Sequence, residues 1–363
     1  MMFETFLVIV TVLYVVQGVL LLIGLRRKRD AATDDRPFVS VVIAARDEAH
    51  NIGACLRSVL DQTYAADRYE IILADDGSTD GTADIARGTA ADDVRFRLLT
   101  VVPEQRLPGK TGALAQAIDQ ARGEIVLITD ADCVVPPTWV EATAKRYAPD
   151  VALVGGVTLH QTTRPFDGMQ SLDWAYILGM AASTAGFGYP LGSIGNNLSF
   201  RKAAYDAVGG YRALKFSVTE DYTLVQAIVR HSRWRYLYPI DPRILVETKP
   251  CPTISALIRQ KHRWGTGGLD MRWGGMLIGI IGYLAHAAPF VMLWWGGVIA
   301  AATALLVKSI VDYAFLYSIL WRLDRTADLK YFWWFEVYFT AYVLALPFLV
   351  FFGGPVRWKG RSF

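Results

Sequence analysis

One stretch, residues 124–133, restricts the folds open to this chain more than any other. It reads Glu-Ile-Val-Leu-Ile-Thr-Asp-Ala-Asp-Cys, a short apolar run that ends in two aspartates, Asp130 and Asp132. A continuous apolar run of this kind is typical of a buried strand in a parallel sheet. Open α/β sheets bind ligands at the carboxyl ends of their strands, and carboxylate oxygens suit Mg²⁺ or Mn²⁺. The stretch therefore indicates a strand with a candidate metal site; a strand followed by a polar turn has the same pattern.

Strands and helices alternate through the first third of the chain. Segments 38–45, 69–74 and 96–102 are rich in branched apolar residues, and segments 51–60, 83–88 and 110–122 have helical patterns. This alternation predicts a Rossmann-like α/β domain with a mostly parallel, doubly wound sheet. Beyond residue 139 the pattern loosens. Apolar residues near helical spacing between 166 and 180 predict one amphipathic helix, which we expect to cover the sheet; a position on the membrane surface is the alternative.

The apolar character of the chain is concentrated in segments long enough to cross a membrane. Residues 6–25 are almost wholly apolar, and the basic run Arg26-Arg27-Lys28-Arg29 follows. Because a helical span needs about 20 residues and basic flanks stay inside, we predict a retained anchor within residues 1–30 and a cytosolic domain after it.

The carboxy-terminal part, residues 274–363, is also membrane-like. Segments 275–295, 298–321 and 332–352 predict about three further spans. A fourth crossing would place Arg357, Lys359 and Arg361 outside, against the charge rule, so a re-entrant last segment is the alternative. Lys308 and Asp312 are four residues apart inside a predicted span, which favours a neutralising pair that faces other helices.

Charge and cysteine content exclude several classes of protein. The net charge of +3 is mild, and nucleic-acid binding is therefore not expected. The three cysteines lack CxxC spacing, and the five histidines lack ligand spacing. The sequence thus indicates neither a disulfide framework nor a zinc site.

A second acidic motif, Asp75-Asp76-Gly-Ser-Thr-Asp-Gly-Thr, follows the predicted strand at 69–74. Its glycines permit a tight turn, and its carboxylates can accept hydrogen bonds from a nucleobase N–H or from ribose hydroxyls. Alone it is also compatible with a polar turn that caps a helix. With another acidic pair, Asp130 and Asp132, expected on a neighbouring strand, we favour nucleotide-sugar binding.

Two later motifs allow two interpretations each. Thr219-Glu220-Asp221 suits a helix start with a threonine cap, which is also a rigid place to mount a catalytic base. Gln260-Lys-His-Arg263-Trp264 lies in the basic, aromatic segment 251–273, which predicts an interfacial amphipathic segment. An anchoring role explains this segment, and so does a role in binding phosphate and an acceptor ring.

Taken in order, these motifs resemble the GT-A domain of family 2 inverting glycosyltransferases. The resemblance covers about residues 37–268 and rests on the motifs at 41–48, 75–82, 109–114, 130–132, 195–201, 219–221 and 260–264. The last two are similar to those of the membrane-embedded branch with cellulose, hyaluronan and chitin synthases, and ceramide glucosyltransferases share a related set. The resemblance implies a GT-A domain over residues 37–250, followed by the interfacial segment 251–273 and the transmembrane region 274–363.

The resemblance also implies roles for individual residues. Glu48, Asp75 and Asp76 would hold the uridine of a UDP-sugar, Lys110 would approach the diphosphate or the sugar, and Asp130 would bind the ribose or the sugar. Asp132, together with Asp130, would ligate Mg²⁺ or Mn²⁺. Asp221 would be the general base and Glu220 would orient the acceptor. Gln260, Arg263 and Trp264 would bind the diphosphate and the acceptor.

The expected function is transfer of a sugar from a cytosolic UDP-sugar to a hydroxyl of a membrane lipid. We favour a lipid because the few predicted spans leave little material for a polymer channel. Processive β-glycan synthesis is the alternative enzyme function. A catalytically inactive membrane scaffold is a third possibility, although it has no chemical need for Asp76, Asp130, Asp132 and Asp221 together.

Overall fold

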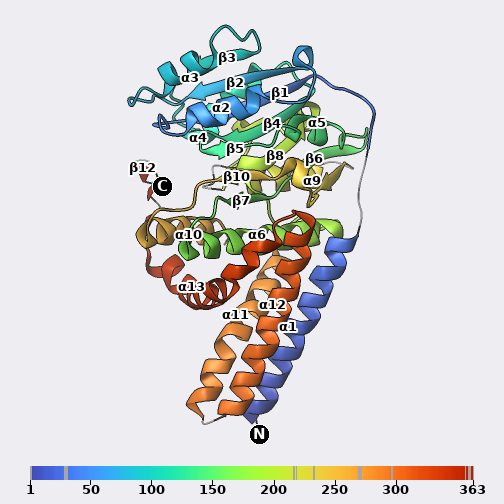
Figure 1. Cartoon of the computed structure of the whole chain (residues 1–363), viewed down its shortest axis with the longest axis vertical. Coiled ribbons are helices and arrows are strands. Elements are labelled where there is room, and N and C mark those ends of the chain that lie inside the picture. Colours follow the sequence, from blue (N-terminus) through green and yellow to red (C-terminus); the bar gives the residue numbers. More distant parts are fainter. Residues whose placement is uncertain are drawn as a thin grey trace. The chain divides into compact units, whose positions relative to one another are not determined.

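A computed structural model describes residues 2–27, 32–215, 217, 219–231, 234–268, 272–295, 297–355, 357–358 and 361–362. Lys28 and Arg29 of the basic run, residues 269–271 of the interfacial segment, and Lys359 lie outside the described residues. The chain divides into two compact units (Figure 1). The sheet unit comprises residues 28–159 and 188–249, and the helical unit comprises residues 1–27, 160–187 and 250–363.

The sheet unit is built on a seven-stranded sheet with the strand order β3-β2-β1-β4-β8-β6-β9. Its strands are β1 Val39–Ala45, β2 Tyr69–Asp75, β3 Phe96–Thr100, β4 Ile125–Asp130, β6 Val151–Gly155, β8 Leu198–Arg201 and β9 Arg235–Leu237. Neighbouring strands are parallel except at β8, which is antiparallel to both β4 and β6. The mostly parallel α/β prediction is confirmed, and the sheet is mixed because β8 runs in the opposite direction.

A second sheet has the order β5-β10-β7, with β5 Cys133–Val134, β7 Thr158–His160 and β10 Val246–Thr248. The helices of the sheet unit are α2 Ile52–Leu60, α3 Thr82–Ala90, α4 Lys110–Asp119, α5 Trp139–Ala144, α7 Lys202–Ala207, α8 Gly210–Ala213 and α9 Glu220–His231. Short 3-10 turns are η1 Ala66–Arg68, η2 Gly195–Asn197 and η3 Pro242–Ile244. The strands β5 to β10 were not predicted, because segments of two to five residues carry too little periodicity.

The parallel strands bring acidic residues to one edge of the sheet. β1, β2 and β4 are almost completely buried, as expected for continuous apolar runs covered on both faces. Asp75 is the register partner of Ala45, and Asp130 is the partner of Ala44. The two acidic motifs therefore follow strands on either side of β1, and the expectation that their strands are direct neighbours was wrong.

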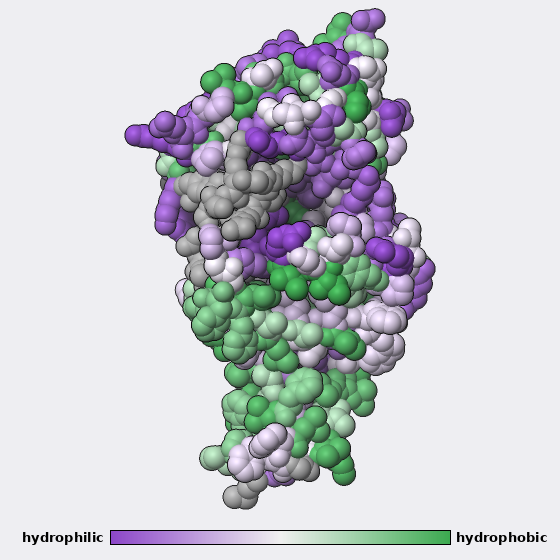
Figure 2. Space-filling view, turned by 90° about the vertical axis from the view of Figure 1, so that its left-hand side faces the viewer, coloured by the Kyte–Doolittle hydropathy of each residue, from purple (hydrophilic) through white to green (hydrophobic). Residues whose placement is uncertain are grey.

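The helical unit contains four long apolar helices that have the length and composition of membrane spans. Its elements are α1 Met2–Arg26, α6 Pro165–Gly186, α10 Ile254–Gly268, α11 Trp273–Trp294, α12 Val298–Arg322, η4 Thr326–Tyr331, α13 Phe332–Phe352, β11 Arg357–Trp358 and β12 Arg361–Ser362. Figure 2 shows an apolar surface over the long helices. Exposed apolar side chains of these helices include Val8, Ile9 and Val12. These features indicate membrane association.

The four apolar helices are not equivalent. α1, α11 and α12 run side by side, whereas α13 lies across them next to α10 (Figure 1). Phe3 stacks on Trp295 at one end of the bundle, with ring centroids 4.9 Å apart. At the other end Arg322 donates a hydrogen bond of 2.6 Å to the carbonyl of Leu25. The carboxyl-terminal ends of helices α1 and α12 therefore lie at the same end of the bundle.

Helix α6 belongs to the helical unit and packs against α1, α12 and α13. We expected an amphipathic helix that covers the sheet; instead nearly every residue from Asp167 to Gly186 is buried. The predicted Lys308–Asp312 pair is confirmed, with 2.9 Å between Nζ and Oδ2. Lys308 also pairs with Glu336 at 2.9 Å, and Tyr176 of α6 donates a 3.0 Å hydrogen bond to Asp312. These contacts join α6, α12 and α13 through polar groups in an apolar setting.

Candidate active site

Two loops at the edge of the sheet are joined by hydrogen bonds. One loop follows β1 at residues 46–49, and the other follows β2 at residues 76–82. Four backbone N–H groups donate across them: Asp47 to Ser78 Oγ at 2.9 Å, Glu48 to Thr82 Oγ1 at 2.8 Å, Ala49 to Asp80 Oδ2 at 2.9 Å, and Thr79 to Asp47 Oδ1 at 2.9 Å. Asp47 has a φ of 51°, in the left-handed region that aspartate tolerates better than most residues. The predicted donor-binding loops thus form one connected structure.

The predicted uridine-binding acids are held within this structure. Asp75 accepts hydrogen bonds from the backbone N–H and the hydroxyl of Ser78, which shapes the turn. Arg46 lies 3.5 Å from Asp76 Oδ2 and donates a 2.9 Å hydrogen bond to the Asp76 carbonyl. Glu48 accepts a 2.7 Å hydrogen bond from Asn51. The sequence analysis gave Arg46 no role. The available signal was its position next to Asp47 and Glu48.

Lys110 connects acids from two distant parts of the sheet unit. It is the first residue of α4, and its Nζ lies 2.6 Å from Asp130 Oδ1 and 3.4 Å from Glu220 Oε1. Burial by itself would lower the pKa of Lys110, but Asp130 and Glu220 outweigh it, and the pKa lies above its usual value. The lysine is therefore a permanent cation between two predicted site residues.

Gly195 places Asp221 in the same group. A Cβ atom at Gly195 would lie 3.4 Å from both Lys110 Nζ and the Cβ of Asp221. Asp221 is the second residue of α9 and accepts a 2.8 Å hydrogen bond from the backbone N–H of Tyr222. Lys110, Asp130, Glu220 and Asp221 therefore gather around Gly195, in a space that a larger residue would narrow.

Asp132 stands beside further negative charge. Burial, and after it the charges of Asp130 and Glu48, raise the pKa of Asp132 to about 6. Crowded carboxylates of this kind suit a divalent cation, which would relieve their repulsion. Among the residues that the structure describes, no three His, Cys, Asp or Glu side chains form a complete ligand set. Any cation here needs oxygen ligands from another source, such as a bound phosphate.

Buried tyrosines surround the acids, and sequence reasoning missed them. Tyr211, Tyr236 and Tyr238 are each less than a tenth exposed. Burial, and after it the charge of Asp221, raises the pKa of Tyr238 above its usual range. The available signal was the alternation Tyr236-Leu-Tyr238, but β9 is only three residues long. These phenols therefore stay neutral and form a low-dielectric wall beside Asp221.

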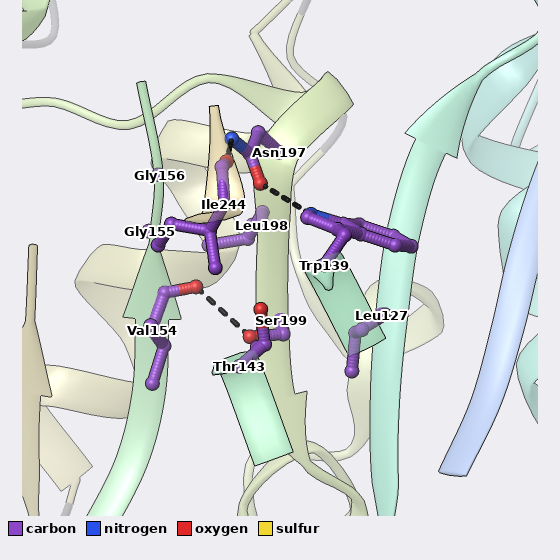
Figure 3. A pocket seen from close by; sticks show the side chains of 10 residues that line it. All are labelled: Leu127, Trp139, Thr143, Val154, Gly155, Gly156, Asn197, Leu198, Ser199 and Ile244. Atoms are coloured by element: carbon purple, nitrogen blue, oxygen red, sulfur yellow. Dashed lines mark hydrogen bonds between the residues drawn. The ribbon is translucent and has the colours of Figure 1, made fainter. Parts of the chain in front are cut away.

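The motif at 195–201 contributes more to the scaffold than to the site. Asn197 accepts a 3.0 Å hydrogen bond from Trp139 Nε1 and donates two of 2.9 Å to the carbonyls of Val157 and Ile244. Figure 3 shows Trp139, Asn197 and Ile244 among the residues that line a small internal pocket. The pocket has no space for a water molecule, so it is part of the core. Only Gly195 of this motif faces the acids described above.

The remaining predicted residues, Gln260, Arg263 and Trp264, lie on α10 of the helical unit and are half-buried. The ring of Trp264 packs at 5.2 Å from the ring of Trp174 on α6. The structure thus brings Lys110, Asp130, Glu220 and Asp221 together and sets Asp132 beside Asp130 and Glu48. The meeting of Trp264 with the acids of the sheet unit stays a prediction.

Residues 40–223 match the family model described as glycosyl transferase family 2. This match covers half of the chain, and the chain therefore belongs to this family and is a glycosyltransferase.

Three curated relatives illustrate its place in the family. The chain is 39% identical over 127 residues to glycosyltransferase AglE of Haloferax volcanii, covering 34% of this chain and 40% of AglE. It is 30% identical over 250 residues to the beta-monoglucosyldiacylglycerol synthase of a Synechocystis species, covering 66% and 49%. It is 27% identical over 238 residues to the poly-beta-1,6-N-acetyl-D-glucosamine synthase of Staphylococcus epidermidis, covering 64% and 55%. The matches thus span about half the length of these relatives.

A solved structure supports the fold. The mannosyltransferase of Pyrobaculum calidifontis, in complex with GDP-Man and Mn²⁺, superposes with a TM-score of 0.61. It is 21% identical and covers 97% of this chain and 99% of that one. The predicted fold is confirmed: a mixed, mostly parallel α/β GT-A-like domain with four long apolar helices.

Proposed function

We propose that this glycosyltransferase moves a sugar, with inversion, from a UDP-sugar to a hydroxyl of a membrane lipid. The observation that carries the proposal is the gathering of Lys110, Asp130, Glu220 and Asp221 around Gly195. It combines a cation for a diphosphate with a carboxylate that can act as a base. These are the groups that an inverting displacement needs.

The donor would bind at the edge of the sheet. Glu48, Asp75 and Asp76 would hold the uridine through carboxylate and backbone groups of the joined loops. Lys110 would exchange its contact with Asp130 for the donor diphosphate or sugar, and Asp130 would then be available to the ribose or the sugar. The site is half-buried, and water therefore screens these contacts less than it would at an exposed surface.

The acids also fit a divalent cation. Asp132, with Asp130, would hold Mg²⁺ or Mn²⁺, because their carboxylates repel one another without it. A bound ion would offset the charge that grows on the leaving diphosphate. Two protein carboxylates with substrate phosphates form a common coordination pattern for Mg²⁺. The Mn²⁺ bound to the mannosyltransferase of Pyrobaculum calidifontis agrees with this assignment.

Asp221 would act as the general base. It would take the proton of the acceptor hydroxyl while the hydroxyl oxygen bonds to the anomeric carbon and the bond to the diphosphate breaks. Glu220 would orient the acceptor. Gln260, Arg263 and Trp264 would contact the diphosphate and the acceptor from the helical unit.

Two observations favour a lipid acceptor, and a third favours a cytosolic site. The relative from Synechocystis is named for a diacylglycerol product, and the apolar helices would hold this chain at the bilayer. The basic residues Arg26 and Arg27 at the end of α1 favour the cytosolic side. The polymer synthase of Staphylococcus epidermidis supports processive glycan synthesis as the second candidate.

Product analysis tests the proposal. Purified protein would be incubated with radiolabelled UDP-sugars, membrane lipids and Mn²⁺ or Mg²⁺, with Asp221→Asn in parallel. We expect a labelled product that partitions into organic solvent and is absent with the variant. A long water-soluble polymer would favour the second candidate, and no turnover of any donor would favour the inactive scaffold.

A further inference from the structure

Lys261 is a charged residue buried inside the Gln260–Trp264 motif. Its side chain is only 1% exposed, and its Nζ forms an ion pair with Asp173 of α6, which is fully buried. Tyr338 of α13 donates a 3.1 Å hydrogen bond to the same carboxylate. Because a buried charge is costly unless it is paired, this contact ties α10, α6 and α13 together.

The same ammonium group touches two aromatic rings. It lies 4.7 Å from the ring centre of Trp264 and 4.8 Å from that of Tyr342 on α13. A desolvated cation over an aromatic face is attracted to the ring. Trp264 also packs against Trp174 of α6. The orientation of the Trp264 ring thus depends directly on Lys261.

A second contact holds α10 close to its start. Gln170 of α6 is fully buried and exchanges two hydrogen bonds with the backbone of Cys251. The Cys251 N–H donates to Oε1 at 2.9 Å, and Gln170 Nε2 donates to the carbonyl at 3.2 Å. Gln170 and Asp173 are three residues apart and lie on neighbouring positions of α6. Helix α10 is therefore held at two points, and Lys261 provides the second one.

We propose that Lys261 is a positioning residue for the transfer reaction. Trp264 follows Lys261 at i+3, so the two share one face of α10, toward α6 and α13, whereas Arg263 points about 160° away from Lys261. The ion pair with Asp173 fixes the rotation of α10 and so the direction of that face. This inference rests on the proposed function and concerns its acceptor, which would rest on Trp264, because the Lys261 ammonium contacts the Trp264 ring.

Four variants test it: Lys261→Met, Asp173→Leu, the two combined, and Lys330→Met as a control. Lys330 is an exposed lysine that lies over the ring of Tyr331 at 4.9 Å. For each protein we would measure the thermal midpoint, hydrolysis of UDP-glucose without acceptor, and transfer to dioctanoylglycerol. The three readouts separate stability, donor chemistry and acceptor positioning.

Each single change leaves one buried charge without its partner, so both variants should lose stability and transfer. The combined variant has no orphan charge and should regain the thermal midpoint. Its KM for dioctanoylglycerol should nevertheless stay about 10- to 100-fold above that of the wild type, with UDP-glucose hydrolysis unchanged. A combined variant that regains both stability and acceptor KM would overturn the inference, because the pair would then be purely structural.

If the combined variant does not fold, the variant Tyr338→Phe tests the positioning role of Lys261. It removes only the hydroxyl that contacts Asp173, and we expect the acceptor KM to rise about 3- to 10-fold without a change in UDP-glucose hydrolysis. An unchanged acceptor KM would contradict a positioning role. A wild-type protein that turns over no donor would instead refute the proposed function, independently of any variant.

Discussion

The ammonium of Lys110 lies 2.6 Å from Oδ1 of Asp130 and joins the first residue of α4 to the last residue of β4. The same ammonium reaches Glu220 at the start of α9. A lysine from a helix start therefore neutralises acids from two other elements where the proposed donor diphosphate would bind. Anything that changes this cation should change both donor binding and the charge balance of the site.

Replacing Lys110 with Met should lower kcat/KM for the UDP-sugar by about 10²- to 10³-fold, because one charged contact to the developing negative charge is lost. Lys202→Met, which removes a surface pair with Asp206, is the matched control. Because the pKa of Lys110 lies above its usual value, the lysine stays protonated until the pH exceeds that raised pKa. The ratio of wild-type to variant kcat/KM should therefore be constant between about pH 6 and pH 9. A ratio that falls toward 1 in this range would show that Lys110 titrates.

Changing Asp221 to Asn should lower kcat by about 10²- to 10⁴-fold, since an amide cannot take the proton of the acceptor hydroxyl. Donor affinity and the thermal midpoint should change little. Asp206→Asn, at an exposed carboxylate of the same unit, serves as the control. Equal transfer rates for Asp221→Asn and wild type would remove Asp221 from the role of base.

Removing divalent cations with EDTA should abolish transfer, and Mn²⁺ or Mg²⁺ should restore it. Asp132→Asn should raise the Mn²⁺ concentration for half-maximal activity at least about tenfold, because it removes a proposed ligand. Asp84→Asn, which changes only an exposed pair with Arg87, should leave that concentration unaltered. Full activity in EDTA would show that the crowded acids serve another purpose.

Replacing Asn197 with Ala should destabilise the sheet unit by about 2–4 kcal/mol, because Trp139 and two carbonyls lose their partners in the core. Asn196→Ala breaks one hydrogen bond of 2.8 Å with Thr158 and should cost about 1 kcal/mol. Denaturant unfolding followed by fluorescence measures both values. If Asn197→Ala keeps its stability but loses donor binding, Asn197 acts in the site and not in the scaffold.

The last apolar helix should remain on one side of the membrane. A Cβ atom at Gly353, after the end of α13, would lie 2.7 Å from His262 on α10, and one at Gly265 would touch Leu346 of α13 at 2.7 Å. The carboxyl-terminal half of α13 thus packs against the carboxyl-terminal half of α10, which agrees with the re-entrant alternative and would keep Arg357 and Arg361 inside.

Cysteine labelling measures this arrangement. In a cysteine-free background, Pro355→Cys should react with a membrane-impermeant maleimide only from the cytosolic side, and Trp295→Cys, at the opposite end of the bundle, only from outside. Both positions are exposed. Reaction of both from outside would mean that α13 crosses the bilayer.

The sequence by itself determined the strands β1, β2 and β4 and the acids that follow them. Their signal is local: a continuous apolar run specifies a buried strand, and the residues after its end must lie at the sheet edge. The apolar helices could equally be predicted from the sequence, because length and hydrophobicity alone decide whether a segment suits a bilayer.

Only the tertiary structure decided which of these groups meet. The contact of Lys110 with Glu220 joins residues 110 positions apart, and the pair Lys261–Asp173 joins residues 88 apart. The burial of nearly every residue of α6 and the transverse course of α13 likewise depend on neighbours far away in the chain. Periodicity shows which side chains of a segment face apolar surroundings and which face polar ones. It carries no information on which distant segment supplies those surroundings, and that choice is made by packing and by the pairing of buried charges.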